Sequence, residues 1–541
     1  MPGERRISLR GLPIVQLALA ACLVIWLTVL CRPIGWRGQW QWVATAQSLA
    51  PGPLIAGITA LAAALIGAWS MQRRRLEIAW RALLVLGASV WPLLLYSSVP
   101  NAWATLTAAT VTDVSCEYFG EAYRLTDPLA YCAGYAEHQR ASGHHLATHP
   151  PGAVLTYWAI IEAARATGLD EAARPLVEGL AGARSRDMAE AFRHIPTARP
   201  IAAADIALPF IVAVVFSVLG ALTVLPAAAA ARAVWGPEGA LPAGLLAATV
   251  PGLSMLFQCL DAPLALVVAV AVWLTIRACA IPLTPALSPA SGERQEDGSG
   301  ETEEDESAQR GNGLPLPAPR GEGTSGGHLH AALAGFVLGL GLFISFGVLA
   351  AVALCGLVAL CGGWSRPAET RRARMRNALP PAAWLALGVA VVWVLLVVFL
   401  GQDPLAMAAR SAESHRSVIA GFHRAYGIWV WMNLVEYGVF LGPALAALVV
   451  CGASAARARG GPAACLAMAT LAALALLDLS GTVRAEVGRI WLFFAAPLAV
   501  IAAGACLPTV GHPRRLWLTV ALQVVALLAL VAAVHPSVRP F

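Results

Sequence analysis

The sequence predicts an all-α polytopic membrane protein with about 13 transmembrane helices and an extracytoplasmic region of short helices. The chain has 541 residues, of which 58% are hydrophobic and 13% are charged, and its mean hydropathy is +0.68. Apolar runs recur along it, and many approach the roughly 20 residues that a helix needs to cross the hydrocarbon. The runs are continuous rather than alternating, which excludes a β-barrel, the other fold that lipid admits.

The expected spans form two membrane modules joined by a polar linker. The first module covers 1–282 and includes an extracytoplasmic loop region at 101–205, and the second covers 328–541. Residues 283–327 are rich in Pro, Gly, Ser, Glu and Asp, so they cannot bury enough apolar surface to fold, and we expect disorder there. The expected spans are 12–31, 53–71, 80–98, 206–226, 238–257, 263–281, 329–346, 347–362, 380–400, 427–451, 462–478, 489–507 and 516–534.

Arginine clusters predict how these spans are oriented. The clusters lie in the N-terminal tail and at 73–75, 366–376, 457–459 and 514–515, which fall on one side of the membrane under this assignment. Basic residues favour cytoplasmic loops. We therefore expect a multi-pass protein of the inner (plasma) membrane with a cytoplasmic N-terminus. The apolar run at 12–31 is too long for an ordinary cleavable signal.

Two segments after the first polar loop do not read as full spans. Residues 153–167 are apolar but short and contain Glu162. We expect a half-embedded or re-entrant helix there, which is tolerated only where protein buries it. Residues 168–200 carry mixed charges with an amphipathic pattern, which indicates one or two surface helices at the interface.

The polar loop at 101–152 concentrates acids and histidines in an otherwise apolar chain. Glu117 and Glu121 stand four residues apart, so on a short helix they would share one face. Such a pair near a membrane surface suits a general base with a hydroxyl or metal partner, and ordinary surface acidity is the alternative. Asp113 is a third candidate for the base.

Histidines and cysteines in the same loop leave several readings open. His144, His145 and His149 have a spacing that could bind a metal, but no carboxylate stands at a fixed distance. We therefore assign no metal ligand and require no cofactor, and a divalent metal stays an open alternative. Pro150 and Pro151 restrict the backbone, so they would present His149 rigidly. Cys116 and Cys132 could form a disulfide if the loop faces an oxidising compartment.

Two further acids belong to the membrane modules. Asp261 precedes Pro263 at the mouth of an expected span, where capping of the helix N-terminus and a functional role are both open. Glu436 lies a turn or two inside a later span. A carboxylate at that depth is costly in lipid, so we expect it to face the protein interior or a watery cavity.

A charged segment at 484–491 precedes another span on the expected outer side. Arg484, Glu486 and Arg489 lie there, although arginine usually gathers on the cytoplasmic side. Snorkelling of a long side chain at the membrane boundary is one explanation. The planar guanidinium also matches phosphate oxygens, so a lipid-linked phosphate in the outer leaflet is the other.

Four motifs together resemble the GT-C superfamily of integral membrane glycosyltransferases, and the similarity covers most of residues 100–505. The resemblance is closest to the bacterial relatives of aminoarabinose and protein O-mannosyl transferases. The motifs are YFGEA at 118–122, THPPG at 148–152, PGLSMLFQCLDAP at 251–263 and RAEVGRIW at 484–491.

The resemblance implies transfer of a sugar from a polyprenyl-phosphate donor to a lipid, glycan or protein acceptor on the outer face. An acid of the first outer loop would take the proton of the acceptor, with Glu121 preferred over Glu117 and Asp113, and Asp261 would be a second acid at the site. Arg489 and Arg484 would hold the leaving phosphate. The remaining expected substrate-binding residues are Tyr118, His149, Glu486 and Glu436.

Two other functional classes stay open. A membrane transporter or lipid flippase needs ionisable residues along a path through the membrane, and only Glu436 lies well inside an expected span. A non-catalytic assembly subunit is the third reading. Convergence of Glu121, His149, Asp261 and Arg489 on one cavity would favour the enzyme. The net charge of +6 comes from arginines beside spans, so it indicates topology rather than a nucleic-acid partner.

Overall fold

The described chain is almost entirely helical, which confirms the all-α class. The computed structural model describes residues 11–36, 40–42, 47–100, 106–107, 110–111, 117–141, 144–194, 200–280, 325–365, 370–421, 424–507 and 513–534. Within these ranges the strands are β1 (Ile34–Trp36) and β2 (Trp40–Trp42), an antiparallel pair in which Ile34 lies opposite Trp42. The expected linker at 283–327 lies outside the described residues except for 325–327, which belong to helix α17.

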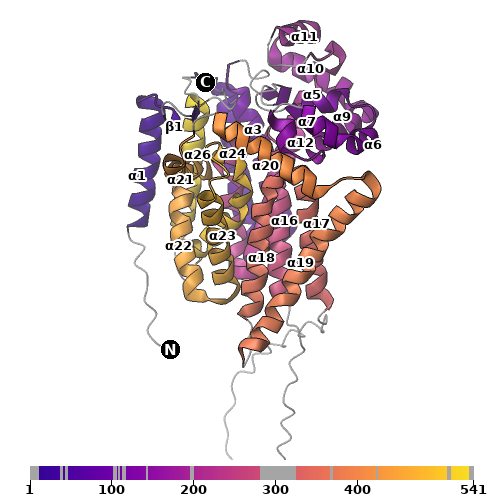
Figure 1. The fold of residues 1–541 in the computed structure, drawn as a ribbon. Helices are drawn as coiled ribbons and strands as arrows, with labels where there is room; N and C mark the ends of the chain where they lie inside the picture. Colours follow the sequence, from indigo (N-terminus) through magenta and orange to yellow (C-terminus); the bar gives the residue numbers. More distant parts are fainter. Residues whose placement is uncertain are drawn as a thin grey trace, which may run out of the picture.

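Most of the long membrane helices run roughly parallel to one another in one bundle (Figure 1). Those of the first module are α1 (Leu12–Val24) with the π-helical turn η1 (Ile25–Val29), α2 (Pro51–Arg73), α3 (Glu77–Ser97), α12 (Leu208–Leu222), α13 (Val224–Trp235), α14 (Pro237–Ala248), α15 (Pro251–Met255) and α16 (Asp261–Ala280). Those of the second module are α17 (Ser325–Ile344), η3 (Phe346–Val348), α18 (Leu349–Trp364), α19 (Arg371–Leu400), α21 (Tyr426–Leu441), α22 (Pro443–Arg459), α23 (Gly461–Leu479), α24 (Val487–Ile490), η4 (Leu492–Phe494), α25 (Ala495–Ala503), η5 (Gly504–Cys506) and α26 (Pro513–Ala533).

Ten of the described helical stretches are long and apolar enough to cross a membrane, or eleven if the bent pair of α21 and α22 forms one span. A polytopic membrane protein is therefore supported, and the expected number of about 13 spans stays a prediction. With α21 and α22 counted as one span, the difference from 13 arises in two places. The apolar stretch at 238–257 is divided between the short helices α14 and α15. The stretch at 489–507 contributes only a short apolar helix, Leu492–Cys506.

The expected single span at 427–451 is broken in the structure. Helices α21 and α22 meet at Gly442 with a bend of 103°. Gly442 has φ 96° and ψ 120°, a conformation that favours glycine because it has no Cβ. The bend turns α21 away from the line of α22 and places it in contact with α24. Helix α21 therefore lies beside the charged segment at 484–491.

A layer of short helices covers one end of the bundle (Figure 1). Its members are α5 (Glu117–Arg124), α6 (Pro128–Ala133), α7 (Tyr135–Ala141), α8 (His144–Thr148), α9 (Gly152–Thr167), α10 (Leu169–Ala181), α11 (Ser185–Arg193) and η2 (Ala203–Asp205). The segment expected to be half-embedded is α9, whose Tyr157 is fully buried and makes ring contacts with Phe119 of α5 and Phe216 of α12. The expected surface helices at 168–200 correspond to α10 and α11.

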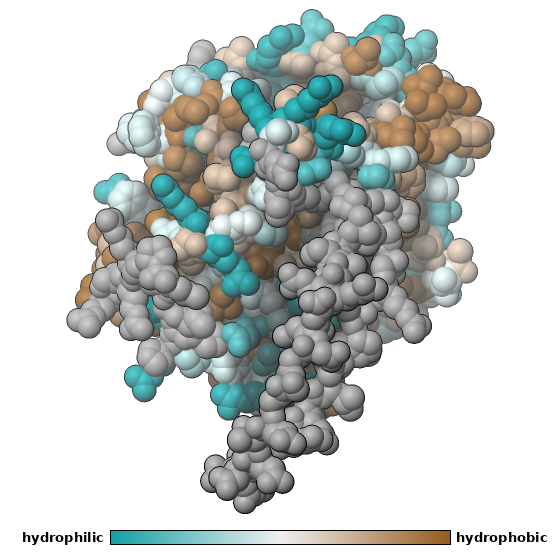
Figure 2. Space-filling model, turned by 90° about the horizontal axis from the view of Figure 1, so that it is seen from below, coloured by the Kyte–Doolittle hydropathy of each residue, from teal (hydrophilic) through white to brown (hydrophobic). Residues whose placement is uncertain are grey.

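The arginine-bearing helix ends gather at the opposite end of the bundle. The guanidinium of Arg459 lies 5.6 Å from the ring centroid of Trp235, which joins the ends of α22 and α13. Arg232 lies 3.4 Å from Glu77, the first residue of α3. Seen from this end, hydrophilic side chains are interspersed with apolar ones (Figure 2). The bundle therefore has one arginine-rich end and one end with the layer of short helices.

Candidate functional site

A cavity of about 510 Å³ lies between the layer of short helices and the membrane bundle. It is bounded by residues from α5, the turn after α8, α16, η3, α18, α24 and the amphipathic helix α20 (Pro404–Gly421). α20 crosses the same end of the bundle as the short helices (Figure 1). Segments from both membrane modules therefore build one site.

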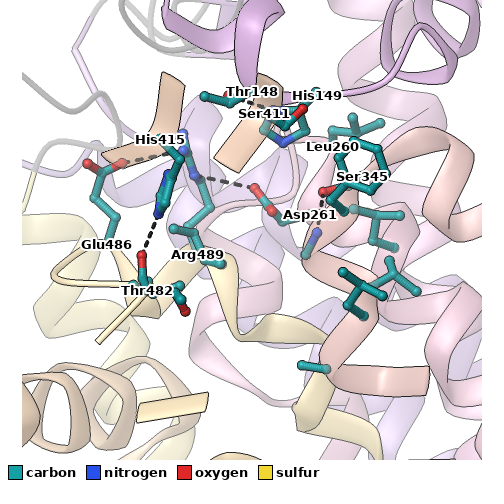
Figure 3. Close-up of a pocket in the computed structure, with 18 of the residues that line it drawn as sticks. Thr148, His149, Leu260, Asp261, Ser345, Ser411, His415, Thr482, Glu486 and Arg489 are labelled. Carbon is teal, nitrogen blue, oxygen red and sulfur yellow. Dashed lines mark hydrogen bonds and ion pairs between the residues drawn. The ribbon is translucent and has the colours of Figure 1, made fainter. Parts of the chain in front are cut away.

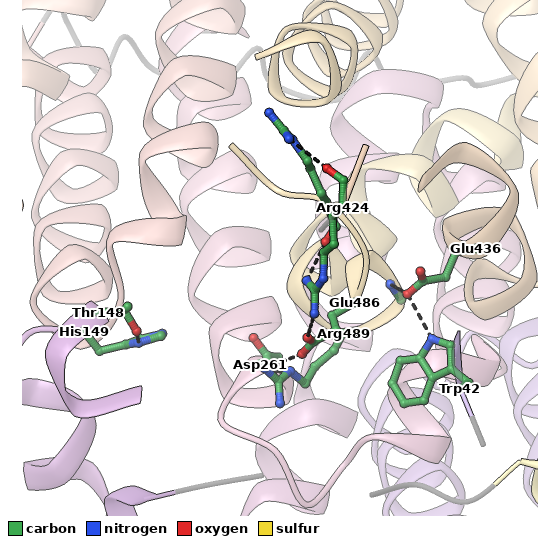
Figure 4. Close-up of polar contacts among 10 residues, drawn as sticks. Trp42, Thr148, His149, Asp261, Arg424, Glu436, Glu486 and Arg489 are labelled. Carbon is green, nitrogen blue, oxygen red and sulfur yellow. Dashed lines mark hydrogen bonds and ion pairs between the residues drawn. The ribbon is translucent and has the colours of Figure 1, made fainter. Parts of the chain in front are cut away.

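One wall of the cavity carries a chain of alternating charges. Arg489 lies between two carboxylates, with its Nε 3.4 Å from Asp261 Oδ2 and its Nη2 3.3 Å from Glu486 Oε2. Arg424 Nη2 lies 3.0 Å from the other oxygen of Glu486. Figures 3 and 4 show Arg489 between Asp261 and Glu486, and Figure 4 adds Arg424 beyond Glu486. This network joins the start of α16 to α24 and to the residues before α21.

The charge on this wall favours a bound anion. Arg489 is paired with the carboxylates of Asp261 and Glu486, and opposite charges at this distance favour the charged guanidinium. Arg484, which also lines the cavity, adds a third guanidinium to those of Arg424 and Arg489. Three guanidiniums against two carboxylates leave a surplus of one positive charge, which attracts anions into a cleft. Within the described chain, Nη1 of Arg489 makes no protein hydrogen bond.

The facing wall comes from the THPPG segment and α5. His149 Nδ1 lies 3.0 Å from Thr148 Oγ1, and its ring is 5.3 Å from that of Tyr118 in an edge arrangement. The hydroxyl of Tyr135 donates to the carbonyl oxygens of His149 and Leu146, which fixes the turn. The backbone at Gly152 approaches α17 so closely that a Cβ there would lie 2.3 Å from the carbonyl oxygen of Phe343. The turn therefore holds His149 at the cavity.

Helix α20 completes the cavity with Ser411 and His415. Gln139 Nε2 donates to Ser411 Oγ at 3.0 Å, and so ties α20 to α7. The His415 ring forms a hydrogen bond with the carbonyl oxygen of Thr482, which connects α20 to the charged segment (Figure 3). The sequence analysis selected neither residue. It also did not select Arg424, although this arginine lies on the same side of the expected membrane as Arg484 and Arg489.

Six residues expected at the site from the sequence line this single cavity: Tyr118, His149, Asp261, Arg484, Glu486 and Arg489. Asp261 is both the first residue of α16 and a partner of Arg489. The sequence analysis named four residues whose convergence on one cavity would favour an enzyme. Three of them, His149, Asp261 and Arg489, line this cavity. The fourth, Glu121, does not line the cavity.

The other expected site residues lie elsewhere. Glu117 accepts a hydrogen bond from the backbone N–H of Leu146 at 3.0 Å, which ties α5 to α8. Glu121 is half-buried on α5. Glu436 is fully buried, as expected, but it faces the protein interior beside Trp42 rather than the cavity (Figure 4). Asp113 lies outside the described residues.

The metal and disulfide alternatives receive no support from the described residues. Within them, no group of three or more His, Cys, Asp or Glu side chains could hold a metal ion. The side chains of His144 and His145 lie outside that part of the chain, as does Cys116, the expected partner of Cys132. Burial raises the pKa of the Cys132 thiol to about 11, so this thiol is neutral at physiological pH.

The fold and the cavity define a class of protein: a polytopic helical membrane protein with a charged cavity beneath a layer of short helices. Comparison with known proteins adds no narrower identity, because no family model, curated protein or solved structure matches the chain.

Proposed function

We propose that this protein is an integral membrane glycosyltransferase that moves a sugar from a polyprenyl-phosphate donor to an acceptor on the outer face of the membrane. The observation that carries the proposal is the position of Arg489. It lies between Asp261 and Glu486 in a cavity that also contains Tyr118 and His149 from the first polar loop. The four motifs behind the GT-C resemblance thus supply residues to, or beside, one site.

The composition of the cavity suits a lipid that carries one phosphate. The wall formed by Arg489, Arg484 and Arg424 provides the surplus positive charge, and a guanidinium binds phosphate oxygens with directional hydrogen bonds. Apolar side chains line much of the rest of the cavity, and a prenyl chain would be buried against them favourably because apolar area leaves water. These side chains include Leu264, Phe346, Leu349, Ile490 and Phe493.

The proposed reaction is a direct displacement at the anomeric carbon of the sugar. The acceptor hydroxyl forms the new C–O bond, and the bond between the anomeric carbon and the phosphate oxygen breaks with its electron pair going to the polyprenyl phosphate. Negative charge grows on that phosphate in the transition state, where a fixed Arg489 stabilises it. The proton of the acceptor passes to a carboxylate.

The loop acids remain the candidates for that base. Of the acids expected to be catalytic, Asp261 lines the cavity, and its Oδ2 is paired with Arg489 Nε at 3.4 Å. We therefore propose that Asp261 orients the side chain of Arg489. Glu121, Glu117 and Asp113 are the candidates for proton transfer. The first two do not line the cavity, so the test includes all three.

The test is transfer of a labelled sugar from a panel of polyprenyl-phosphate sugars in native membranes. Parent protein is compared with Glu121→Gln, Glu117→Gln, Asp113→Asn and Asp261→Asn at matched expression. We expect the parent to transfer sugar and one loop-acid variant to lose transfer while it still binds donor. Asp261→Asn should lower transfer and weaken donor binding together, because Arg489 loses a partner.

Two outcomes would contradict the proposal. The first is a parent protein that transfers none of the sugars in the panel to lipid, glycan or protein acceptors in the membrane. The second is movement of the lipid-linked sugar across the bilayer without transfer, which would instead support a flippase. We place the reaction on the outer face of the inner (plasma) membrane.

A further inference from the structure

The backbone at 485–486 has a conformation that side chains rarely adopt. Ala485 has φ 75° and Glu486 has φ 61°, so two consecutive non-glycine residues lie in the left-handed region. A Cβ crowds the backbone there, and such residues persist only where the surrounding structure holds them. Arg484 precedes this pair and Arg489 follows it shortly, so the conformation decides where both guanidiniums lie.

Asn433 of α21 binds this segment from the side away from the cavity. Its Oδ1 accepts the backbone N–H of Ala485 at 3.1 Å, and its Nδ2 donates to the carbonyl oxygen of Val483 at 2.9 Å. Nδ2 also donates to Asp478 Oδ1 at 2.9 Å, which anchors the amide to α23. Asn433 is only 1% exposed and does not line the cavity, so it contacts the segment and not a ligand.

Glu436, one helical turn later on the same side of α21, binds the segment beyond Glu486. Its Oε1 accepts the backbone N–H of Gly488 at 3.0 Å and the indole N–H of Trp42 at 3.0 Å. The backbone at Gly488 lies so close to α21 that a Cβ there would be 2.2 Å from the ring of Phe440. Gly488 directly precedes Arg489, so this contact fixes the start of the Arg489 side chain.

We propose that Asn433 and Glu436 are positioning residues that hold the segment 483–488, with its left-handed residues Ala485 and Glu486, and thereby aim Arg484 and Arg489 at the anionic ligand. The inference deepens the proposed function and rests on it. Neither residue touches the ligand. Each acts through backbone atoms of a segment whose own conformation is unfavourable without them.

The first experiment measures binding of farnesyl phosphate to the purified full-length chain in detergent. The variants are Asn433→Ala and, as a matched control, Gln16→Ala. Gln16 is a buried amide that bridges Thr519 Oγ1 and the carbonyl oxygen of Ala444 in the membrane bundle, and it does not line the cavity. We expect Asn433→Ala to weaken binding about tenfold, because the free energy of holding one strained residue without support corresponds to a change in affinity of about that size. Gln16→Ala should bind like the parent.

A rescue separates positioning from general damage to the fold. Glycine adopts the left-handed region without the Cβ clash, so Asn433→Ala combined with Ala485→Gly should recover affinity to within about threefold of the parent. Glu436→Gln keeps an acceptor for both N–H groups and should retain affinity, whereas Glu436→Leu should lose it. Asn433→Ser is the reserve variant, with the same expected direction as Asn433→Ala, if the alanine variant does not fold.

Hydrogen exchange of 480–491 tests the inference without any ligand. Exchange there should be faster in Asn433→Ala than in the parent and unchanged in Gln16→Ala. A parent protein that does not bind farnesyl phosphate would contradict the proposed function, while the exchange result would still decide the role of Asn433. Unchanged hydrogen exchange in Asn433→Ala would overturn the inference. If the parent binds farnesyl phosphate, a double variant that recovers no affinity would overturn it as well.

Discussion

Glu486 joins two of the three arginines of the cavity wall, Arg424 and Arg489. Its two carboxylate oxygens lie 3.0 Å from Arg424 Nη2 and 3.3 Å from Arg489 Nη2. The three side chains are 8%, 14% and 17% exposed for Arg424, Arg489 and Glu486. Charges this far from water need their partners, because removing one leaves the other buried and uncompensated.

We therefore predict that Glu486→Gln destabilises the protein by about 3–5 kcal/mol. Thermal unfolding in detergent provides the measurement. The control is Glu190→Gln, which breaks a 2.8 Å pair with Arg193 whose side chains are 54% and 61% exposed. An exposed pair contributes about 0–1 kcal/mol, so the control should unfold close to the parent. Equal shifts in the two variants would contradict this account of the wall.

At this scale the sequence predicts residues that are close together in the chain and misses those that the fold brings in. Arg484, Glu486 and Arg489 stand out because they share one short segment. Arg424 and His415 reach the same cavity through α20 and the residues before α21, and no local spacing links them to that segment. Hydropathy placed Glu436 correctly in the interior, but it could not show that its partners are Trp42 and Gly488 rather than a substrate.

At the scale of elements, the break between α21 and α22 positions the charged segment. A straight helix over 427–451 would carry Asn433 and Glu436 away from α24. The hydropathy of this stretch is continuous, so the sequence predicted one span. Gly442 was the available local signal, and it became informative only with its positive φ.

We predict that Gly442→Ala destabilises the protein by about 1–3 kcal/mol, because the backbone there is unfavourable for a residue with a side chain. The added Cβ would also lie 3.0 Å from Gln523 Cγ and 3.2 Å from Pro251 Cδ. Gly438→Ala in the same helix is the matched control. A Cβ there meets nothing within 4 Å, and alanine should stabilise the helix by up to about 1 kcal/mol. If Gly438→Ala unfolded at a lower temperature than Gly442→Ala, the result would contradict a fixed break between α21 and α22.

The turn between α10 and α11 should depend on pH. Glu178 accepts hydrogen bonds from Ser185 Oγ at 2.6 Å and Ser185 N at 2.8 Å, and these bonds hold the pKa of the carboxyl below its usual value. An unfolded glutamate titrates near a pKa of about 4.3. The stabilisation is therefore complete above that pH and is lost as pH falls through the lower folded-state pKa.

The measurement is hydrogen exchange of 182–188 in the parent and in Glu178→Gln at equal pH, so that the intrinsic pH dependence cancels. The parent should be better protected at pH 7, and the difference should shrink as pH falls below about 4.3 towards the lower folded-state pKa. A difference that stays constant as pH falls below about 4.3 would show that the turn does not depend on the ionised carboxylate.

At the scale of the whole molecule, arginines lie at the end of the bundle opposite the short helices. Arg459, from the cluster at 457–459, lies 5.6 Å from the ring centroid of Trp235 at the end of α13, and Arg232 pairs with Glu77 at the start of α3. Hydropathy detects apolar length but neither bends nor short buried helices, so it divided the region from α12 to α15 and that from α24 to η5 too simply. The region at 101–205 was expected to contain short helices, and its described part does.

The cavity draws on elements from both modules. Our central proposal is that Arg489 stabilises a lipid phosphate there during sugar transfer. The most direct measurement is the rate of transfer from a polyprenyl-phosphate sugar by Arg489→Ala in native membranes. Arg410→Ala is the control, since Arg410 bonds the carbonyl oxygen of Ala136 on the outer side of α20 and does not line the cavity. We predict that Arg489→Ala raises the barrier by about 2–4 kcal/mol, a loss of roughly 30- to 1,000-fold in rate, while Arg410→Ala keeps the parent rate. A normally inserted Arg489→Ala protein with the parent rate would contradict the claim.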